Sequence, residues 1–206
     1  MADNDLVHVV DDDVDVRKSL GFLLATADFA VRLHESATAF LATATGNLDG
    51  CIVADVRMPS IDSIEFLRQL RTRGHTVPVI VMTGHADVAL AVQAIKEGAA
   101  DFIEKPFDDE VLIDAIRSAL NNRNQTGAMH LQSAEIRGRL LTLSEREQQV
   151  LDGLVSGMPN KTIAYDLGIS PRTVEIHRAN VMSKMGASSL SHLVRMALIV
   201  ESKPSA

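Results

Sequence analysis

The chain has 206 residues, of which 46% are hydrophobic and 23% are charged, and its net charge at pH 7 is −7. This length is enough for two modest domains with ordinary cores, and no apolar run approaches the roughly 20 residues that a bilayer span needs. The acidic start, Met1-Ala-Asp-Asn-Asp, and the single cysteine, Cys51, argue against a signal peptide and a disulfide framework, so we expect a cytoplasmic protein without membrane association.

The first half of the chain alternates short apolar runs with segments of helical period. The runs are residues 6–10, 30–33, 52–54, 79–82 and 102–103, and helical spacing follows at about 16–24, 36–44, 64–72, 87–97 and 108–121. Runs that are apolar throughout are typical of strands buried on both faces, as in a parallel sheet with helices on each side. Five strand–helix pairs predict an α/β doubly wound (βα)5 domain, which binds its ligand at the carboxyl ends of its strands.

Polar side chains stand where the predicted strands end. The first run ends at Asp11 and Asp12, the third at Asp55 and the fourth at Thr83, while the fifth leads to Lys105. Clustered carboxylates repel one another unless a cation is present, and oxygen-rich sites with few protein ligands suit Mg²⁺. The Asp55 carboxylate is the candidate nucleophile for an aspartyl phosphate, with the metal and Lys105 neutralising charge on the phosphoryl group.

The second half has a different pattern, because residues 121–139 are polar and aperiodic and the apolar residues after them recur at helical spacing only. Ser144 and Glu147 match a capping box, Asn160 is the predicted cap of the next helix, and Ser170-Pro171 opens a third. A fourth helix is predicted over 189–200. The predicted organisation is therefore a first domain at 1–123, a linker at 124–139 and an all-α four-helix domain at 140–206.

Residues 160–184 carry the packing signature of a helix-turn-helix, in which Ala164 lets two helices approach and Gly168 supplies the turn. Residues 1–120 carry 20 acidic and 10 basic side chains, whereas residues 121–206 carry 7 and 10, so nucleic-acid contact is expected in the second half. Tyr165 is the only aromatic residue there, and single-strand binders stack bases on several. We therefore expect duplex DNA as the ligand, with a plain four-helix bundle as the alternative.

Four motifs in the first half resemble bacterial receiver domains, and most closely those of FixJ-type response regulators. They begin at Val10 (Val-Asp-Asp-Asp), Asp55 (Asp-Val-Arg-Met-Pro), Met82 (Met-Thr-Gly-His) and Glu104 (Glu-Lys-Pro-Phe). The resemblance covers residues 5–121 and implies a sensor histidine kinase as phosphoryl donor. It also implies a cis bond between Lys105 and Pro106.

The resemblance assigns roles by position. Asp55 is the phosphoacceptor; Mg²⁺ is held by Asp11, Asp12, Asp55 and the backbone carbonyl of Arg57; Thr83 and Lys105 contact the phosphoryl group; Phe102 is the switch aromatic; and Val88, Val92 and Lys96 are candidates for a dimer face. Ser60 and Ser63 stand where the family commonly has glycine, so the loop after Asp55 is expected to depart from the family's conformation, because serine tolerates positive φ less well.

The segments around Leu143 (Leu-Ser-Glu-Arg-Glu) and Ser170 (Ser-Pro-Arg-Thr-Val-Glu-Ile-His-Arg) resemble LuxR/NarL-class DNA-binding domains over residues 141–200. The third helix would then enter the major groove. The resemblance implies base contacts by Glu175, Ile176 and Ala179, and phosphate contacts by Lys161, Thr162, Arg172, Thr173, Arg178 and Lys184. It further implies a regulator that forms a homodimer when phosphorylated, binds promoter DNA and activates transcription by RNA polymerase, with nitrogen-fixation and low-oxygen genes as targets.

Two other functions compete with this interpretation. An aspartate-nucleophile phosphatase needs a second aspartate two residues after the nucleophile, where this chain has Arg57, so we predict that the protein is not an enzyme. A regulator that binds partners without phosphorylation would use the crevice only structurally, and the complete set of Asp55, Thr83 and Lys105 argues against it.

Overall fold

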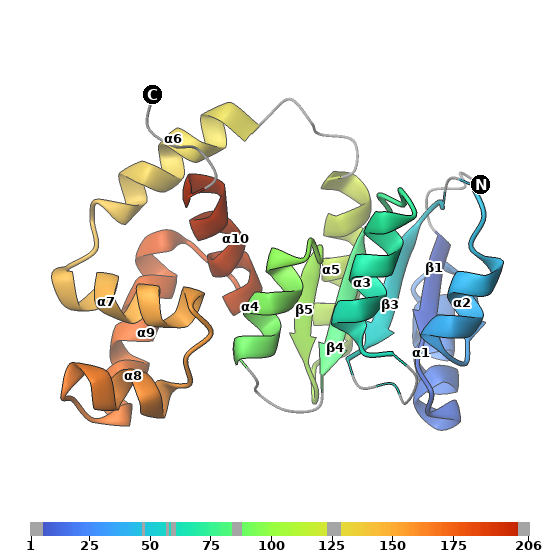
Figure 1. Ribbon diagram of the computed structural model, residues 1–206, viewed down its shortest axis with the longest axis horizontal. Coiled ribbons are helices and arrows are strands. Elements are labelled where there is room, and N and C mark those ends of the chain that lie inside the picture. The colour runs from blue at the N-terminus through green and yellow to red at the C-terminus, as the bar shows by residue number, and fades with distance from the viewer. Residues whose placement is uncertain are drawn as a thin grey trace. The chain divides into compact units, whose positions relative to one another are not determined.

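The structure is a computed structural model, and it describes residues 6–46, 48–56, 58, 61–83, 88–122 and 129–201. The chain divides into two compact units (Figure 1), one within residues 1–86 and 97–125 and the other within residues 87–96 and 126–206. Among the described residues, no helix is both long and apolar enough to cross a membrane.

The first unit is built on a five-stranded parallel sheet in the order β2-β1-β3-β4-β5. Its strands are β1 (Leu6–Val10), β2 (Ala30–His34), β3 (Cys51–Asp55), β4 (Val79–Thr83) and β5 (Asp101–Glu104), and its helices are α1 (Val14–Thr26), α2 (Ala37–Thr43), α3 (Ser63–Thr72) and α5 (Asp109–Asn122). Helices α1 and α5 share a core on one face of the sheet, and α2 and α3 lie on the other (Figure 1). The predicted doubly wound fold is confirmed.

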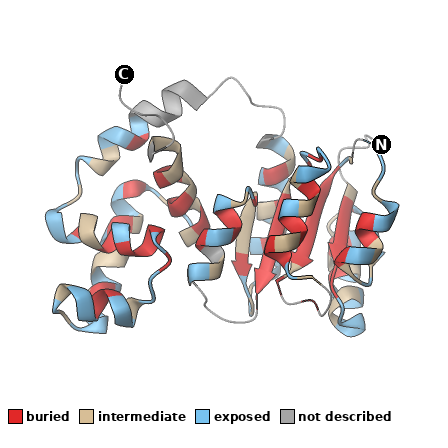
Figure 2. Cartoon of the chain, viewed as in Figure 1, coloured by how far each residue is buried: buried red, intermediate tan, exposed pale blue. Residues whose placement is uncertain are grey.

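Burial explains why the apolar runs identified the strands. Strand β4 is buried along its whole length, and β1 and β3 are buried at all but one position each (Figure 2). Strand β2 lies at the edge of the sheet and is more exposed, with Leu33 47% exposed, so the expectation of burial on both faces holds for the central strands only.

Helix α4 (Val88–Lys96) belongs to the second unit by its contacts, and the other helices of that unit follow the first unit in the chain. They are α6 (Met129–Leu140), α7 (Glu145–Val155), α8 (Asn160–Leu167), α9 (Pro171–Met185) and α10 (Leu190–Glu201). The last four are the helices that the sequence predicts. Their core includes Leu154, Ile163, Val174 and Val181, all buried.

The local signals for these helices are mostly confirmed. Ser144 and Glu147 form the capping box, Ser170 caps α9 before Pro171, and Gly168 takes the left-handed conformation, with φ of 65°, between α8 and α9. The predicted cap at Asn160 is wrong. Pro159 occupies the cap position, because its φ of −62° and extended ψ suit the residue before a helix, and Asn160 is the first helical residue.

Part of the predicted linker is helical. Residues 129–140 form α6, Ile136 of this helix is 3% exposed in the core of the second unit, and Arg139 Nη1 donates to the carbonyl of Met185, the last residue of α9, at 2.6 Å. The segment from 124 to 139 is therefore not irregular throughout, while the domain boundaries themselves stay a prediction.

Candidate functional site

Two carboxylates and a lysine meet at the carboxyl edge of the sheet. Val10 pairs with Ala54, so Asp11 and Asp55 stand at the ends of adjacent strands. Lys105 follows β5, and its Nζ lies 2.8 Å from Asp55 Oδ1 and 3.4 Å from Asp11 Oδ2. Residues that are 94 positions apart in the chain are thus brought together by the parallel sheet, as the sequence predicts.

In this crevice, burial and the neighbouring opposite charges act in opposite directions on the pKa values of Asp11 and Lys105. Burial raises the pKa of Asp11, although a hydrogen bond from the backbone of Asp13 and the charge of Lys105 oppose the shift. Burial alone would lower the pKa of Lys105, but its hydrogen bond to Asp55 and the charges of Asp55 and Asp11 outweigh this effect and raise it. The ammonium group of Lys105 is therefore shared by two close carboxylates.

The next two strands of the sheet, β4 and β5, carry Thr83 and Phe102. Thr83 ends β4 and is 1% exposed, and its carbonyl accepts a hydrogen bond from the backbone N–H of Lys105 at 2.6 Å. Phe102 is half-buried on β5, opposite Val81. The peptide bond between Lys105 and Pro106 is cis, as expected.

The donor set fits a hard cation such as Mg²⁺, which takes oxygen ligands and commonly needs only one or two carboxylates besides water. Asp11 and Asp55 supply such oxygens, and Asp12 is exposed next to Asp11. Arg57 and Ser60 lie outside the described residues. In the part of the chain that the structure describes, no group of three or more His, Cys, Asp or Glu side chains converges on one metal position.

Ser63 does not need the conformational freedom of glycine. It is the first residue of α3, its φ is not positive, and its side chain is fully buried. Serine therefore causes no strain at position 63, where the helix begins. The expected departure of the loop from the family's conformation stays a prediction, because Ser60 lies outside the described residues.

Two neighbours of the crevice were not identified from the sequence. Arg17 Nη1 donates to the backbone carbonyl of Asp11 at 2.7 Å and so holds the acidic turn from α1. A groove of about 660 Å³ runs from Lys105 and Phe107 along α1, where Phe22 is 74% exposed. Phe22 lies off the apolar stripe formed by residues 16, 20, 23 and 24, and this position was the available sequence signal for the apolar face.

In the second unit, the predicted DNA contacts lie on α8 and α9. Exposed or half-exposed side chains occupy every one of these positions: Lys161, Thr162, Arg172, Thr173, Glu175, Ile176, Arg178, Ala179 and Lys184. Ile176 is 55% exposed, and the small Ala179 lies one turn further along α9. The described face of α9 thus combines basic, acidic and apolar groups, as a base-reading surface does.

Lys184 is engaged within the unit. Its Nζ lies 2.6 Å from Glu147 Oε2 and 3.2 Å from the carbonyl of Thr142, and Glu147 also accepts from the backbone N–H of Ser144 at 2.7 Å. The hydrogen bond from Lys184, followed by that from Ser144, lowers the pKa of Glu147 to about 2. These contacts favour a structural role for Lys184, and the glutamate of the capping box was the sequence signal for its partner.

The candidate dimer residues differ in accessibility. The side chain of Val88 lies outside the described residues, Val92 is 3% exposed and Lys96 is exposed. Of the two candidates whose side chains the structure describes, that of Lys96 is exposed and that of Val92 is buried.

Comparison with known proteins identifies both units. Residues 7–117 match the response regulator receiver domain, and residues 141–197 match the luxR family of bacterial regulatory proteins. The chain is 56% identical over 198 residues to the transcriptional regulatory protein FixJ of Azorhizobium caulinodans, covering 96% of this chain and 94% of the relative. It is 41% identical to the response regulator protein TmoT of Ectopseudomonas mendocina, covering 93% and 87%. Among solved structures, full-length FixJ from B. japonicum has a TM-score of 0.57 and 46% identity, covering 97% and 98%.

Proposed function

Because the chain belongs to the response regulators that join a receiver domain to a LuxR-family DNA-binding domain, we propose that it is a transcriptional activator switched on by phosphorylation of Asp55. The observation that carries this proposal is the bridge of Lys105 between Asp55 and Asp11 at the carboxyl edge of the sheet. A side-chain ammonium held against a nucleophilic carboxylate is what a phosphoryl-accepting site requires.

The proposed donor is a phosphohistidine of a sensor histidine kinase. A carboxylate oxygen of Asp55 attacks the phosphorus, the phosphorus–nitrogen bond breaks, and the departing imidazole nitrogen takes up a proton. Lys105 then pairs with an oxygen of the new acyl phosphate, and the Thr83 hydroxyl donates to another. Mg²⁺, held by Asp11, Asp12, Asp55 and the Arg57 carbonyl, would supply further neutralisation of charge on the phosphoryl oxygens.

The groove along α1 supports a kinase contact at this place. Lys105 lines the groove and also touches Asp55, so a partner seated there would bring its phosphohistidine to the acceptor. The exposed ring of Phe22 offers the apolar anchor that protein interfaces commonly contain.

On the output side, we propose that phosphorylated chains form a homodimer through the face of α4 that carries Val88, Val92 and Lys96. Val92 is buried in the structure, so the proposal requires that phosphorylation exposes it. The second half has an excess of only three basic side chains, so one copy alone would bind duplex DNA weakly. Two copies on adjacent half-sites bind far more tightly through effective concentration.

Within each copy, α9 enters the major groove. Glu175, Ile176 and Ala179 read base edges, while Lys161, Thr162, Arg172, Thr173 and Arg178 position the domain on phosphates. A carboxylate in the groove accepts from cytosine N4, so Glu175 would favour C over the other bases at one position. RNA polymerase is the proposed downstream partner, the cytoplasm the proposed location, and nitrogen-fixation and low-oxygen genes the proposed targets.

The experiment compares the wild type with Asp55→Asn in the presence of acetyl phosphate and Mg²⁺. Light scattering measures the molar mass of the protein in solution, and binding to a promoter duplex of the family type measures its DNA affinity. We expect the wild type to form dimers and gain affinity, and Asp55→Asn to do neither. Asp114→Asn, which alters an exposed carboxylate on α5, is the matched control and should behave as the wild type.

Equal behaviour of the wild type and Asp55→Asn would refute the phosphorylation switch. The chain would then be a regulator that acts without phosphorylation.

A further inference from the structure

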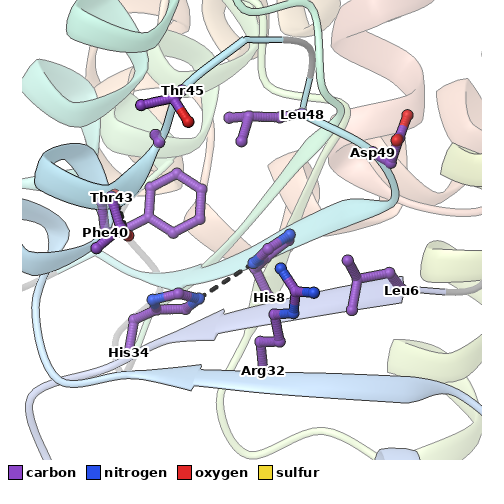
Figure 3. Close-up of a pocket in the computed structure, with 10 residues that line it drawn as sticks. Leu6, His8, Arg32, His34, Phe40, Thr43, Thr45, Leu48 and Asp49 are labelled. Atoms are coloured by element: carbon purple, nitrogen blue, oxygen red, sulfur yellow. Dashed lines mark hydrogen bonds between the residues drawn. The ribbon is translucent and has the colours of Figure 1, made fainter.

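Two histidines on neighbouring strands lie close together, and no role has been assigned to them above. His8 lies on β1 and His34 on β2, and because His8 pairs with Arg32, His34 stands two residues further along the same face. His8 Nδ1 and His34 Nε2 are 3.1 Å apart (Figure 3). Both rings line a cavity of about 380 Å³ that also contacts Phe40 and Asp49.

The two imidazoles are held in place on several sides. The Phe40 ring packs edge-on against both, with centroid distances of 5.2 Å to His8 and 4.9 Å to His34. His8 also donates a hydrogen bond to the backbone of Asp49. A donor contact from one ring nitrogen to a backbone carbonyl is the arrangement that orients metal-binding histidines in proteins.

His8 is uncharged at neutral pH. Burial, followed by the charges of His34 and Arg32, lowers its pKa to about 4. A neutral imidazole keeps a nitrogen lone pair, which is the form that binds a metal ion.

The separation of the two nitrogens matches a chelate. Two ligands at about 2.0–2.1 Å from a tetrahedral Zn²⁺ stand about 3.3 Å apart. The observed distance of 3.1 Å is close to this value, and a small rotation of either side chain would close the difference. A bound ion would replace the proton that the two ring nitrogens share in their hydrogen bond. We infer that His8 and His34 form a two-nitrogen binding site for a late transition-metal dication, of which Zn²⁺ is the representative.

The chemistry of the surroundings refines this assignment. Imidazole selects such ions over Mg²⁺, which prefers oxygen, so the site is chemically distinct from the crevice at Asp55. The cavity leaves room for water in the remaining coordination positions, and the exposed carboxylate of Asp49 lines the same space. Arg32 opposes a cation, because its charge acts on both histidines.

A bound ion would join the edge strand β2 to β1. The backbone carbonyl of His34 already accepts from the N–H of Asp11 at 3.3 Å, so the same strand end borders the phosphorylation crevice. Binding to the folded state alone would also raise the stability of the first unit by mass action.

The test is titration of the full chain with ZnCl₂ by calorimetry, in excess Mg²⁺ and in the Asp55→Asn background, so that the crevice does not contribute. We expect one site per chain that is lost in His34→Gln and in His8→Gln. His192→Gln, which removes a histidine from the second unit, is the matched control and should leave the site intact. Since His8 is 5% exposed and its replacement can disturb folding, the half-exposed His34 is the primary variant.

The variant Arg32→Gln distinguishes a site for a cation from a site for an anion, because it removes a positive charge that opposes a cation and would attract an anion. Removal of the opposing charge should tighten Zn²⁺ binding by about tenfold. Weaker Zn²⁺ binding in Arg32→Gln, or a site that survives in His34→Gln, would overturn the assignment. Because no step depends on Asp55, loss of the phosphorylation switch would leave this result unchanged.

Discussion

The crevice of the first unit and the α9 face of the second are built in opposite ways. In the crevice, Asp11, Asp55 and Lys105 come from three segments, and each of the carboxylates depends on the same ammonium group. On α9, Glu175, Ile176 and Ala179 come from one turn of a helix and are exposed. The crevice is therefore a coupled unit in which one change alters all members, whereas the helix face can change one residue at a time.

The largest effect should come from Lys105→Met, which tests the coupling. Two close carboxylates would lose their shared cation, and the developing phosphoryl charge would lose a stabilising group. We expect phosphorylation by acetyl phosphate to slow by at least about 100-fold, the usual cost of removing one such group. Mass spectrometry of the acyl phosphate against time measures the rate. An unchanged rate would mean that Lys105 only holds the fold.

The pH dependence of stability should be steep in the first unit. The pKa of His8 is about 4 in the folded chain against an ordinary 6.5, so the unfolded chain binds more protons between these values. The contribution is fully present above pH 6.5 and is lost as the pH falls toward 4, by up to about 3 kcal/mol. Hydrogen exchange at the amide of Val53, in the buried strand β3, would report it. His8→Gln should flatten this dependence; an equally steep slope in that variant would assign it to other groups.

Glu175→Gln tests whether the α9 face reads bases one at a time. The amide can donate as well as accept, so the preference at one base pair should change by about 1–3 kcal/mol. Competition among duplexes that differ at single positions measures this preference, and phosphorylation of Asp55 should be unaffected. An equal loss of affinity for all duplexes would contradict a base contact.

The smallest effects should come from two lysines of the second unit. Lys161→Met removes an exposed phosphate contact, so it should weaken binding to all duplexes alike and reduce the salt slope by about 1. Lys184→Met instead breaks the bond to Glu147, so it should lower the thermal midpoint of this unit. Melting curves and salt titrations of both variants make the comparison. Similar results for the two would place both lysines on the DNA.

The stability due to Glu147 also has a defined pH window. Because its pKa falls from an ordinary 4.5 to about 2, this contribution is present above pH 4.5 and disappears toward pH 2. The pH at which acid unfolds the second unit should therefore be lower than the pH at which acid unfolds the first.

The sequence predicts the sheet, the last four helices and the members of the crevice, because strand ends and capping motifs are local signals. Helix α6 was missed because its segment is largely polar. Among its described side chains, Ile136 is buried, Leu140 packs against the same core, and Arg139 donates to the carbonyl of Met185. The structural role of Lys184 was missed because its partner lies on another helix. The pair of His8 and His34 depends on the register of β1 and β2, which no single strand encodes.

The contact of Arg139 with the end of α9 sets a practical limit on dissecting the protein. The luxR-family match begins at residue 141, after both Arg139 and Ile136. A fragment that begins at residue 141 would lack Ile136, which would leave a cavity in the core of the second unit. It would also lack Arg139, whose positive charge lies at the carboxyl end of α9 and offsets the helix dipole. A fragment that begins before α6 would keep both the buried side chain of Ile136 and the positive charge of Arg139. We therefore predict that a stable fragment of the second unit must begin before residue 136, ahead of the start of the luxR-family match at residue 141.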